Sequence, residues 1–349
     1  MPAVGFDIGD DAVRFIELKK TNDGFKVGRF GERINPVLRD RSADITKNGG
    51  FRGFLSSLRE AENLGPINAS LPEDKAYLFA TELVGVDSSL IRSAIEFRLE
   101  EFVPIPAKDA IFDYEIIPSQ AQSGAKTEVG VAVLPKSIVL SYLEMFQSAG
   151  FTPLSFEVAG QAIAKAVVKR GDQRTRIIVY FGKSGSTIFV VKGGAVLFSS
   201  AVSVGGDALT GAFAKDKSVS IALAEKFKWD KGLQFIKGDI ENYAAVLSLL
   251  ASVKEELNRV LSYWKTKKTK EANDKNEDDK IRSIIFCGPE AGLPGLIDYF
   301  KIYISVPSEL ADVWVNVLDV NENIPPISFS KSLAFAAAIG LALSRSRIA

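Results

Sequence analysis

Histidine is absent from this chain of 349 residues, and cysteine occurs only once. Without histidine, the chain cannot build a Ser-His-Asp or Cys-His nucleophile system, a histidine-containing zinc or iron site, or an imidazole pH switch. A single cysteine forms neither an internal disulfide nor a thiolate metal cage, which fits a reducing cytoplasm. The 43 Lys and Arg balance 43 Asp and Glu, so no basic surface for nucleic acid is expected.

Long apolar runs are also missing. The longest, residues 333–343, is shorter than the roughly 20 residues that a membrane-spanning helix needs. Residues 1–7 lack the basic start and the apolar core of a signal peptide. We therefore expect a cytoplasmic protein without direct membrane insertion, which reaches a membrane only through partner proteins.

The order of the expected elements repeats along the chain. A strand, a Gly-containing turn, two further strands and a helix are expected near residues 3–64 and again near 176–215. The two turns are residues 9–11 and 182–186. This repeat predicts an internally duplicated α/β fold with two lobes.

The segment between the two copies has a different order of expected strands and helices. Strands at 111–117 and 128–134 and helices at 88–102 and 136–149 indicate a small α+β insert with its own sheet. A long amphipathic helix is expected at 241–265. Residues 265–280 alternate in charge sign with almost no apolar content, which predicts an exposed, mobile loop rather than a binding tail.

Two polar hairpin turns are the first candidates for chemistry. Gly-rich turns offer backbone N–H groups to a phosphate, and an aspartate at a strand end can hold a metal ion. The first candidate set is Asp7, Gly9 and Arg14, and the second is Gly182, Lys183, Ser184 and Gly185. Each motif alone is also explained by an ordinary exposed turn. Their duplication favours a cleft where both turns meet.

Three weaker motifs follow. Gly205, Gly206 and Asp207 precede a helix whose N-terminus could bind an anion, although Asp207 could equally be a simple N-cap. Glu225 and Lys228 lie three residues apart on one helix face, where they could hold a ribose or an adenine edge, or form only a solvated ion pair. Gly288 and Gly292 lie in a Gly-rich turn that could pass under a base or merely connect two elements. Cys287 is predicted to be a core residue.

The order of these landmarks resembles the actin/Hsp70/hexokinase ATPase fold. More closely, the chain resembles the type IV pilus assembly protein PilM family, in the FtsA-like branch of that superfamily. The most specific stretch is residues 94–106 (AIEFRLEEFVPIP). Further matching stretches are 4–9, 69–72, 204–210 and 255–264.

The resemblance implies an actin-like, ribonuclease H-like two-lobe fold with an inserted α+β subdomain. Lobe I would comprise 1–76, 151–175 and 331–349, the insert 77–150, and lobe II 176–330. It also implies an assembly protein of the type IV pilus machinery, cytoplasmic and peripheral to the inner membrane. The insert would dock the cytoplasmic tail of a PilN-like inner-membrane protein. Pilus motor ATPases and further copies of the chain are additional expected partners.

The resemblance further implies ATP and Mg²⁺ between the lobes, with Asp7 on the metal side. The implied binding residues are Asp7, Gly9, Asp10, Asp11, Arg14, Gly182, Lys183, Ser184, Gly185, Gly205, Gly206, Asp207, Glu225, Lys228, Gly288 and Gly292.

Four residues depart from the family pattern. Asp10 and Asp11 stand where the first turn is usually Ser/Thr-rich with a lysine, and two carboxylates would repel phosphate. Tyr180 stands where the second hairpin opens with an aspartate, and Pro289 follows Gly288 in place of a second glycine. At most a slow ATPase is therefore expected. The alternatives are a pseudo-ATPase scaffold without turnover and an FtsA-like division protein, the latter disfavoured because residues 344–349 follow the last core helix directly.

Overall fold

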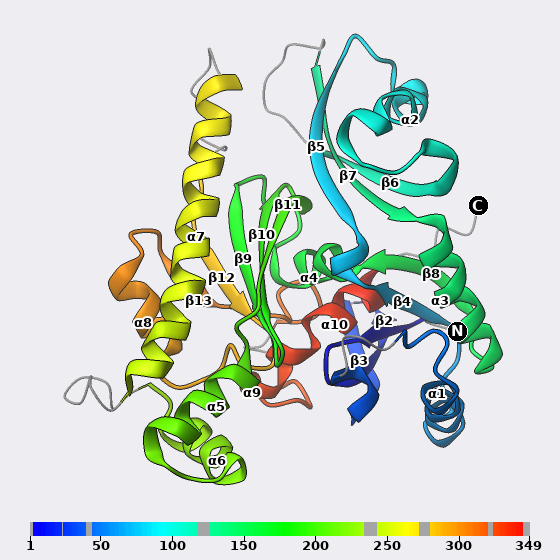
Figure 1. The fold of residues 1–349 in the computed structure, drawn as a ribbon. Helices are drawn as coiled ribbons and strands as arrows, with labels where there is room; N and C mark the ends of the chain where they lie inside the picture. The colour runs from blue at the N-terminus through cyan, green and yellow to red at the C-terminus, as the bar shows by residue number, and fades with distance from the viewer. Residues whose placement is uncertain are drawn as a thin grey trace.

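The computed structural model describes residues 3–22, 24–39, 44–117, 126–233, 243–271, 280–319 and 324–344. Its strands form two five-stranded sheets and one three-stranded sheet (Figure 1). We call the first five-stranded sheet with its helices lobe I and the second lobe II. Within the described ranges, none of the helices combines the length and the apolar character that crossing a membrane requires.

The two large sheets repeat one topology. In lobe I the order is β3-β2-β1-β4-β8, and in lobe II it is β11-β10-β9-β12-β13. In each, an antiparallel hairpin and its third strand are followed by two parallel strands. The duplication predicted from the sequence is confirmed. The strands are β1 (Val4–Ile8), β2 (Ala12–Thr21), β3 (Gly24–Ile34), β4 (Ile67–Leu71), β8 (Pro153–Val158), β9 (Arg176–Phe181), β10 (Ser186–Lys192), β11 (Ala195–Val202), β12 (Ile284–Cys287) and β13 (Ser308–Leu310).

The insert carries its own sheet, of order β5-β7-β6, with α2 lying against it (Figure 1). Its bounds are β5 (Tyr77–Val84), α2 (Ile91–Phe102), β6 (Ala110–Ile117) and β7 (Lys126–Pro135). The following helix α3 (Lys136–Ser148) instead buries Tyr142, Met145 and Phe146 in the lobe I core beside α1 (Gly49–Ala61). Each sheet therefore comes from one of the three predicted segments, while α3 packs on lobe I. The boundaries themselves stay a prediction.

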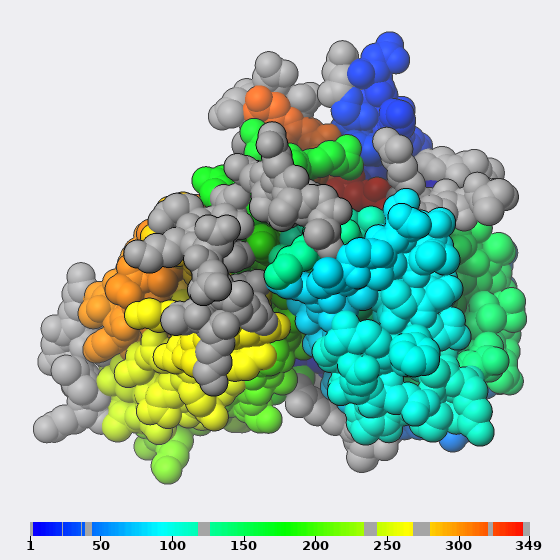
Figure 2. Space-filling view, turned by 90° about the horizontal axis from the view of Figure 1, so that it is seen from above, coloured from blue at the N-terminus to red at the C-terminus, as the bar shows by residue number. Residues whose placement is uncertain are grey.

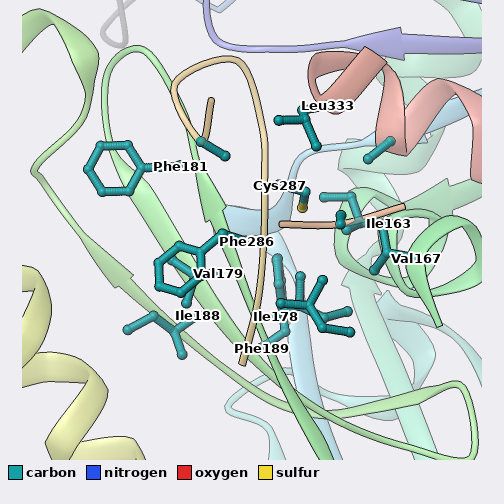
Figure 3. Close-up of a cluster of buried hydrophobic side chains, with 14 of the residues drawn as sticks. Ile163, Val167, Ile178, Val179, Phe181, Ile188, Phe189, Phe286, Cys287 and Leu333 are labelled. Atoms are coloured by element: carbon teal, nitrogen blue, oxygen red, sulfur yellow. The ribbon is translucent and has the colours of Figure 1, made fainter. Parts of the chain in front are cut away.

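Two helices join the lobes. α4 (Ala159–Val167) and α10 (Ala336–Leu343) pack on each other and belong to the same buried cluster as the strands of lobe II. Figure 3 shows Ile163 and Val167 of α4 beside Ile178 of β9. Cys287 of β12 lies close to Ile163 in the same view. Gly340 permits this approach, because a Cβ there would lie 1.7 Å from the carbonyl oxygen of Ala162.

The remaining helices cover lobe II. They are α5 (Gly206–Lys217), α6 (Ile221–Lys231), α7 (Ala244–Glu271), α8 (Leu296–Tyr303) and the short α9 (Phe329–Ser332). α7 continues through residues 265–271, so the loop predicted from 265 onwards is wrong for that part. Lys and Glu are good helix formers, so this charged segment can continue a helix that a polarity criterion alone misses. Residues 272–279 lie outside the described residues.

Candidate functional site

The first hairpin turn places its charged side chains inside the protein. Asp7, at the end of β1, is 3% exposed. Burial raises the pKa of Asp7, and the nearby Arg14 guanidinium and Ser70 hydroxyl lower it less. Gly9 closes the turn by donating its N–H to the Ala12 oxygen at 3.0 Å.

Arg14 is neutralised by carboxylates of its own lobe. Its Nε lies 2.6 Å from Glu32 Oε2 and its Nη2 lies 3.3 Å from Asp11 Oδ1, and Arg14 is only 2% exposed. Burial raises the pKa of Asp11 and Arg14 opposes that rise. Arg14 also acts electrostatically on the buried hydroxyl of Tyr180. Asp11 and Arg14 thus form a structural ion pair.

The second hairpin turn packs directly on the start of α5. The N–H groups of Gly206 and Asp207 donate to the carbonyl oxygens of Gly182 at 3.0 Å and Lys183 at 2.8 Å. A Cβ on Gly205 would lie 2.5 Å from the Gly185 nitrogen, so only glycine allows this contact. The N-cap is Gly205, and Asp207 lies in the first turn of α5. The predicted alternative of an Asp207 N-cap is therefore wrong.

A cluster of four charged side chains, two of them fully buried, lies beside this turn. Lys183 Nζ is 2.7 Å from oxygens of both Glu225 and Glu290, and Lys228 Nζ is 2.8 Å from oxygens of the same two carboxylates. The side chains of Lys228 and Glu290 are both 0% exposed. Lys228 also donates to Thr210 Oγ1 at 3.0 Å. The predicted Glu225–Lys228 ion pair exists, but its lysine is buried and not solvated.

Mutual neutralisation explains the electrostatics of this cluster. Although burial alone would raise it, the pKa of Glu225 is lowered to about 2 by hydrogen bonds from Lys183 and Lys228. Burial would lower the pKa of Lys183, and the Glu290 and Glu225 carboxylates raise it. Sequence reasoning missed Glu290. The available signal was a charged residue in the Gly- and Pro-rich turn directly after a buried strand.

The two hairpin turns meet across the lobes. Asp10 Oδ2, in the β1–β2 turn, accepts the Ser184 N–H at 2.6 Å and the Ser184 hydroxyl at 2.7 Å. The predicted juxtaposition of both turns is thus present, and it is a direct contact between them.

Sequence comparison agrees with this architecture. The profile of the family described as type IV pilus assembly protein PilM matches residues 5–346. The chain belongs to the PilM family.

Two solved structures are similar to this PilM family member. One, a "PilM-PilN type IV pilus biogenesis complex", has a TM-score of 0.72 at 18% identity, with 98% of each chain covered. The other, ethanolamine utilization protein EutJ from Carboxydothermus hydrogenoformans, has a TM-score of 0.54 at 13% identity, covering 98% of this chain and 89% of that one. At these identities the likeness concerns the fold, and together with the duplicated sheets it confirms the predicted actin-like class.

Of the two predicted glycines after β12 in this PilM family member, packing requires Gly288 but not Gly292. Gly288 has a φ of +102°, and a Cβ there would lie 2.6 Å from the Phe181 oxygen. Its N–H donates to the Leu333 oxygen at 3.0 Å. Gly292 lies beside Ser330, with ordinary room for a Cβ at 3.4 Å. Cys287 is fully buried, as predicted for a core residue.

The residues of the site do not fit Mg-ATP as they are arranged. The donors of Ser184 bind Asp10, and the first donors of α5 bind the carbonyls of Gly182 and Lys183. Asp10 Oδ1 is buried without a hydrogen-bond partner among the described residues, and as an acceptor it would repel phosphate. Among those described residues, no group of three or more Asp, Glu or Cys side chains is arranged to hold a metal ion. No catalytic step through a nucleotide follows from this arrangement.

Proposed function

We propose that this PilM family protein docks the cytoplasmic tail of a PilN-like inner-membrane protein through its inserted subdomain. Membership of the pilus assembly family supports this role, and the similar solved structure is a complex of PilM with PilN. Such docking would hold the protein at the cytoplasmic face of the inner membrane. Contacts with pilus motor ATPases and self-association stay predictions.

Two exposed apolar side chains, Phe97 of α2 and Leu90 just before it, are the observation that carries the proposal. The face formed by Ile91, Ile95 and Leu99 fills the core of the insert. Leu90, in the short 3-10 turn just before α2, and Phe97, within α2, are 54% and 89% exposed. A phenylalanine so exposed is not needed for packing, and such apolar surface marks an interaction site. Figure 2 shows the insert, in cyan and turquoise, as a broad surface on the face seen from above.

A labelled synthetic peptide of the cognate tail tests the proposal by fluorescence anisotropy with the full chain. Because Phe97 is the most exposed apolar side chain of α2, Phe97→Ser is expected to weaken binding by about tenfold or more. The matched control is Phe329→Ser, the same change at a phenylalanine of α9 that is 53% exposed. Equal affinity of Phe97→Ser and the control would remove α2 from the docking site. Deleting residues 77–150 is a poorer test, since it strips α3 from the lobe I core.

A pseudo-ATPase scaffold is the second candidate role for the lobes. The closed charge cluster and Tyr180 at the position of the family's aspartate favour it. Phosphate release from ATP is then expected to stay near background. ATP hydrolysis at about 1 per second, the low end of ordinary enzyme rates, would contradict this role without affecting tail docking.

A further inference from the structure

Asp10 makes a contact that its place in the sequence does not predict. It belongs to the β1–β2 turn of lobe I, and its partner Ser184, 174 residues away, belongs to the β9–β10 turn of lobe II. One carboxylate oxygen accepts both the backbone N–H at 2.6 Å and the hydroxyl at 2.7 Å. The contact therefore joins the lobes at the point where their two hairpins face each other.

The donors that Ser184 offers are of the kind that binds phosphate. A backbone N–H and a hydroxyl in a Gly-rich turn are common donors to anionic oxygen atoms. A carboxylate oxygen is an acceptor of the same class. Gly182 permits the approach, because a Cβ there would already lie 3.1 Å from Asp10 Oδ2. Asp10 thus fills the position that an external anion would take.

Neighbouring groups of the turn already take part in other hydrogen bonds and ion pairs. The carbonyls of Gly182 and Lys183 accept hydrogen bonds from the start of α5. The Lys183 ammonium lies 2.7 Å from both Glu225 and Glu290. An incoming phosphate would consequently compete with the Asp10 carboxylate for the Ser184 donors.

We propose that Asp10 is an internal latch, a carboxylate that holds the lobes together by occupying the anion position at Ser184. A phosphate group, either inorganic or carried by a nucleotide, binds there only by displacing Asp10. The latch rests on the two-lobe scaffold of the proposed function and is independent of tail docking at α2.

Calorimetric titrations with tripolyphosphate and with ATP test the latch in the full chain. EDTA is present so that no cation bridges the carboxylate and the phosphate. Asp10→Asn is expected to bind both ligands about tenfold or more tightly than the wild type, because the competing charged hydrogen bonds and the repulsion are removed. Asp10→Glu, which keeps the charge, should gain much less. Asp74→Asn is the charge-matched control, since Asp74 is exposed and 3.0 Å from Lys75.

Amide hydrogen exchange at Ser184 gives a readout that does not depend on ligand affinity. In the free protein, exchange at Ser184 should be faster in Asp10→Asn than in the wild type or Asp74→Asn. Unchanged exchange overturns the latch, as does equal or weaker binding of both ligands or no binding by any variant. A gain confined to ATP would also overturn it, because the competing group would not be the phosphate. Tail-peptide affinity, measured on the same variants, separates these failures from a failure of the docking proposal.

Discussion

Replacing Glu290 by glutamine should destabilise the protein, because Glu290 and Lys228 are the fully buried members of the charge cluster. In the wild type, two lysines and two glutamates neutralise one another, and Lys228 and Glu290 are both 0% exposed. Glu290→Gln keeps the side-chain shape but leaves Lys183 and Lys228 to share the single carboxylate of Glu225. One positive charge then lacks a counter-charge in a buried position.

The expected loss is about 2–4 kcal/mol of unfolding free energy. Removing one partner of a buried ion pair costs about 3–5 kcal/mol, since the remaining charge stays desolvated. The cost is lower here because Glu225 still lies 2.8 Å from Lys228, and Lys183 is 16% exposed. Urea unfolding followed by tryptophan fluorescence measures the change, and Trp229 reports on the site by donating to Glu225 Oε1 at 3.1 Å.

A double-mutant cycle decides whether charge imbalance is the cause. Lys183→Met in the Glu290→Gln background restores neutrality, so the double variant should be more stable than the sum of the single losses predicts. A loss below about 1 kcal/mol in Glu290→Gln, or strict additivity in the cycle, would refute the reasoning.

Two further predictions concern packing and burial. Gly340→Ala should cost about 3 kcal/mol or more in urea unfolding, because its Cβ would lie 1.7 Å from the Ala162 oxygen and force α10 away from α4. Gly211→Ala in α5, where nothing lies within 4 Å of the new Cβ, should be neutral or slightly stabilising, and a comparable loss there would remove the steric explanation. Burial raises the pKa of the Glu73 carboxyl to about 7, above its usual 4.5. The free energy of unfolding of the wild type should therefore fall as pH rises from about 4.5 through 7, because the folded protein must then ionise a buried carboxyl. Glu73→Gln, which can still accept the Gly160 N–H, should therefore gain roughly 3 kcal/mol over the wild type between pH 4 and pH 8; a difference that does not change with pH would contradict the burial argument.

Local patterns predicted much of the fold because they act within one element. Alternating apolar residues and a polar turn identified the hairpins at 9–11 and 182–186, and both are present in the structure. The same reasoning ended the long helix too early, at residue 265, since it treated a charged segment as loop. The helix continues there because Lys and Glu have high helix propensity, which a polarity criterion ignores.

The candidate site was predictable as a set of turns but not as a set of contacts. The sequence placed Asp10 and Ser184 in two turns of a duplicated fold and so suggested that they would face each other. Nothing local indicated that the carboxylate of one turn would accept both donors of the other. Equally, Glu225 and Lys228 were recognised as a pair three residues apart, while Glu290, which completes their cluster, was not.

The sequence by itself determined the duplicated α/β architecture, the insert and the family, because these depend on periodic patterns and the order of landmarks along the chain. Only the tertiary structure decided which charged side chains are buried and which side chains they pair with. Lys228 looks like a surface lysine in the sequence, and it becomes fully buried because the turn after β12 brings Glu290 over α6. The contact of Asp10 with Ser184 was likewise decided by distances across the lobes, where electrostatic energies depend on a few ångströms and on exclusion of water.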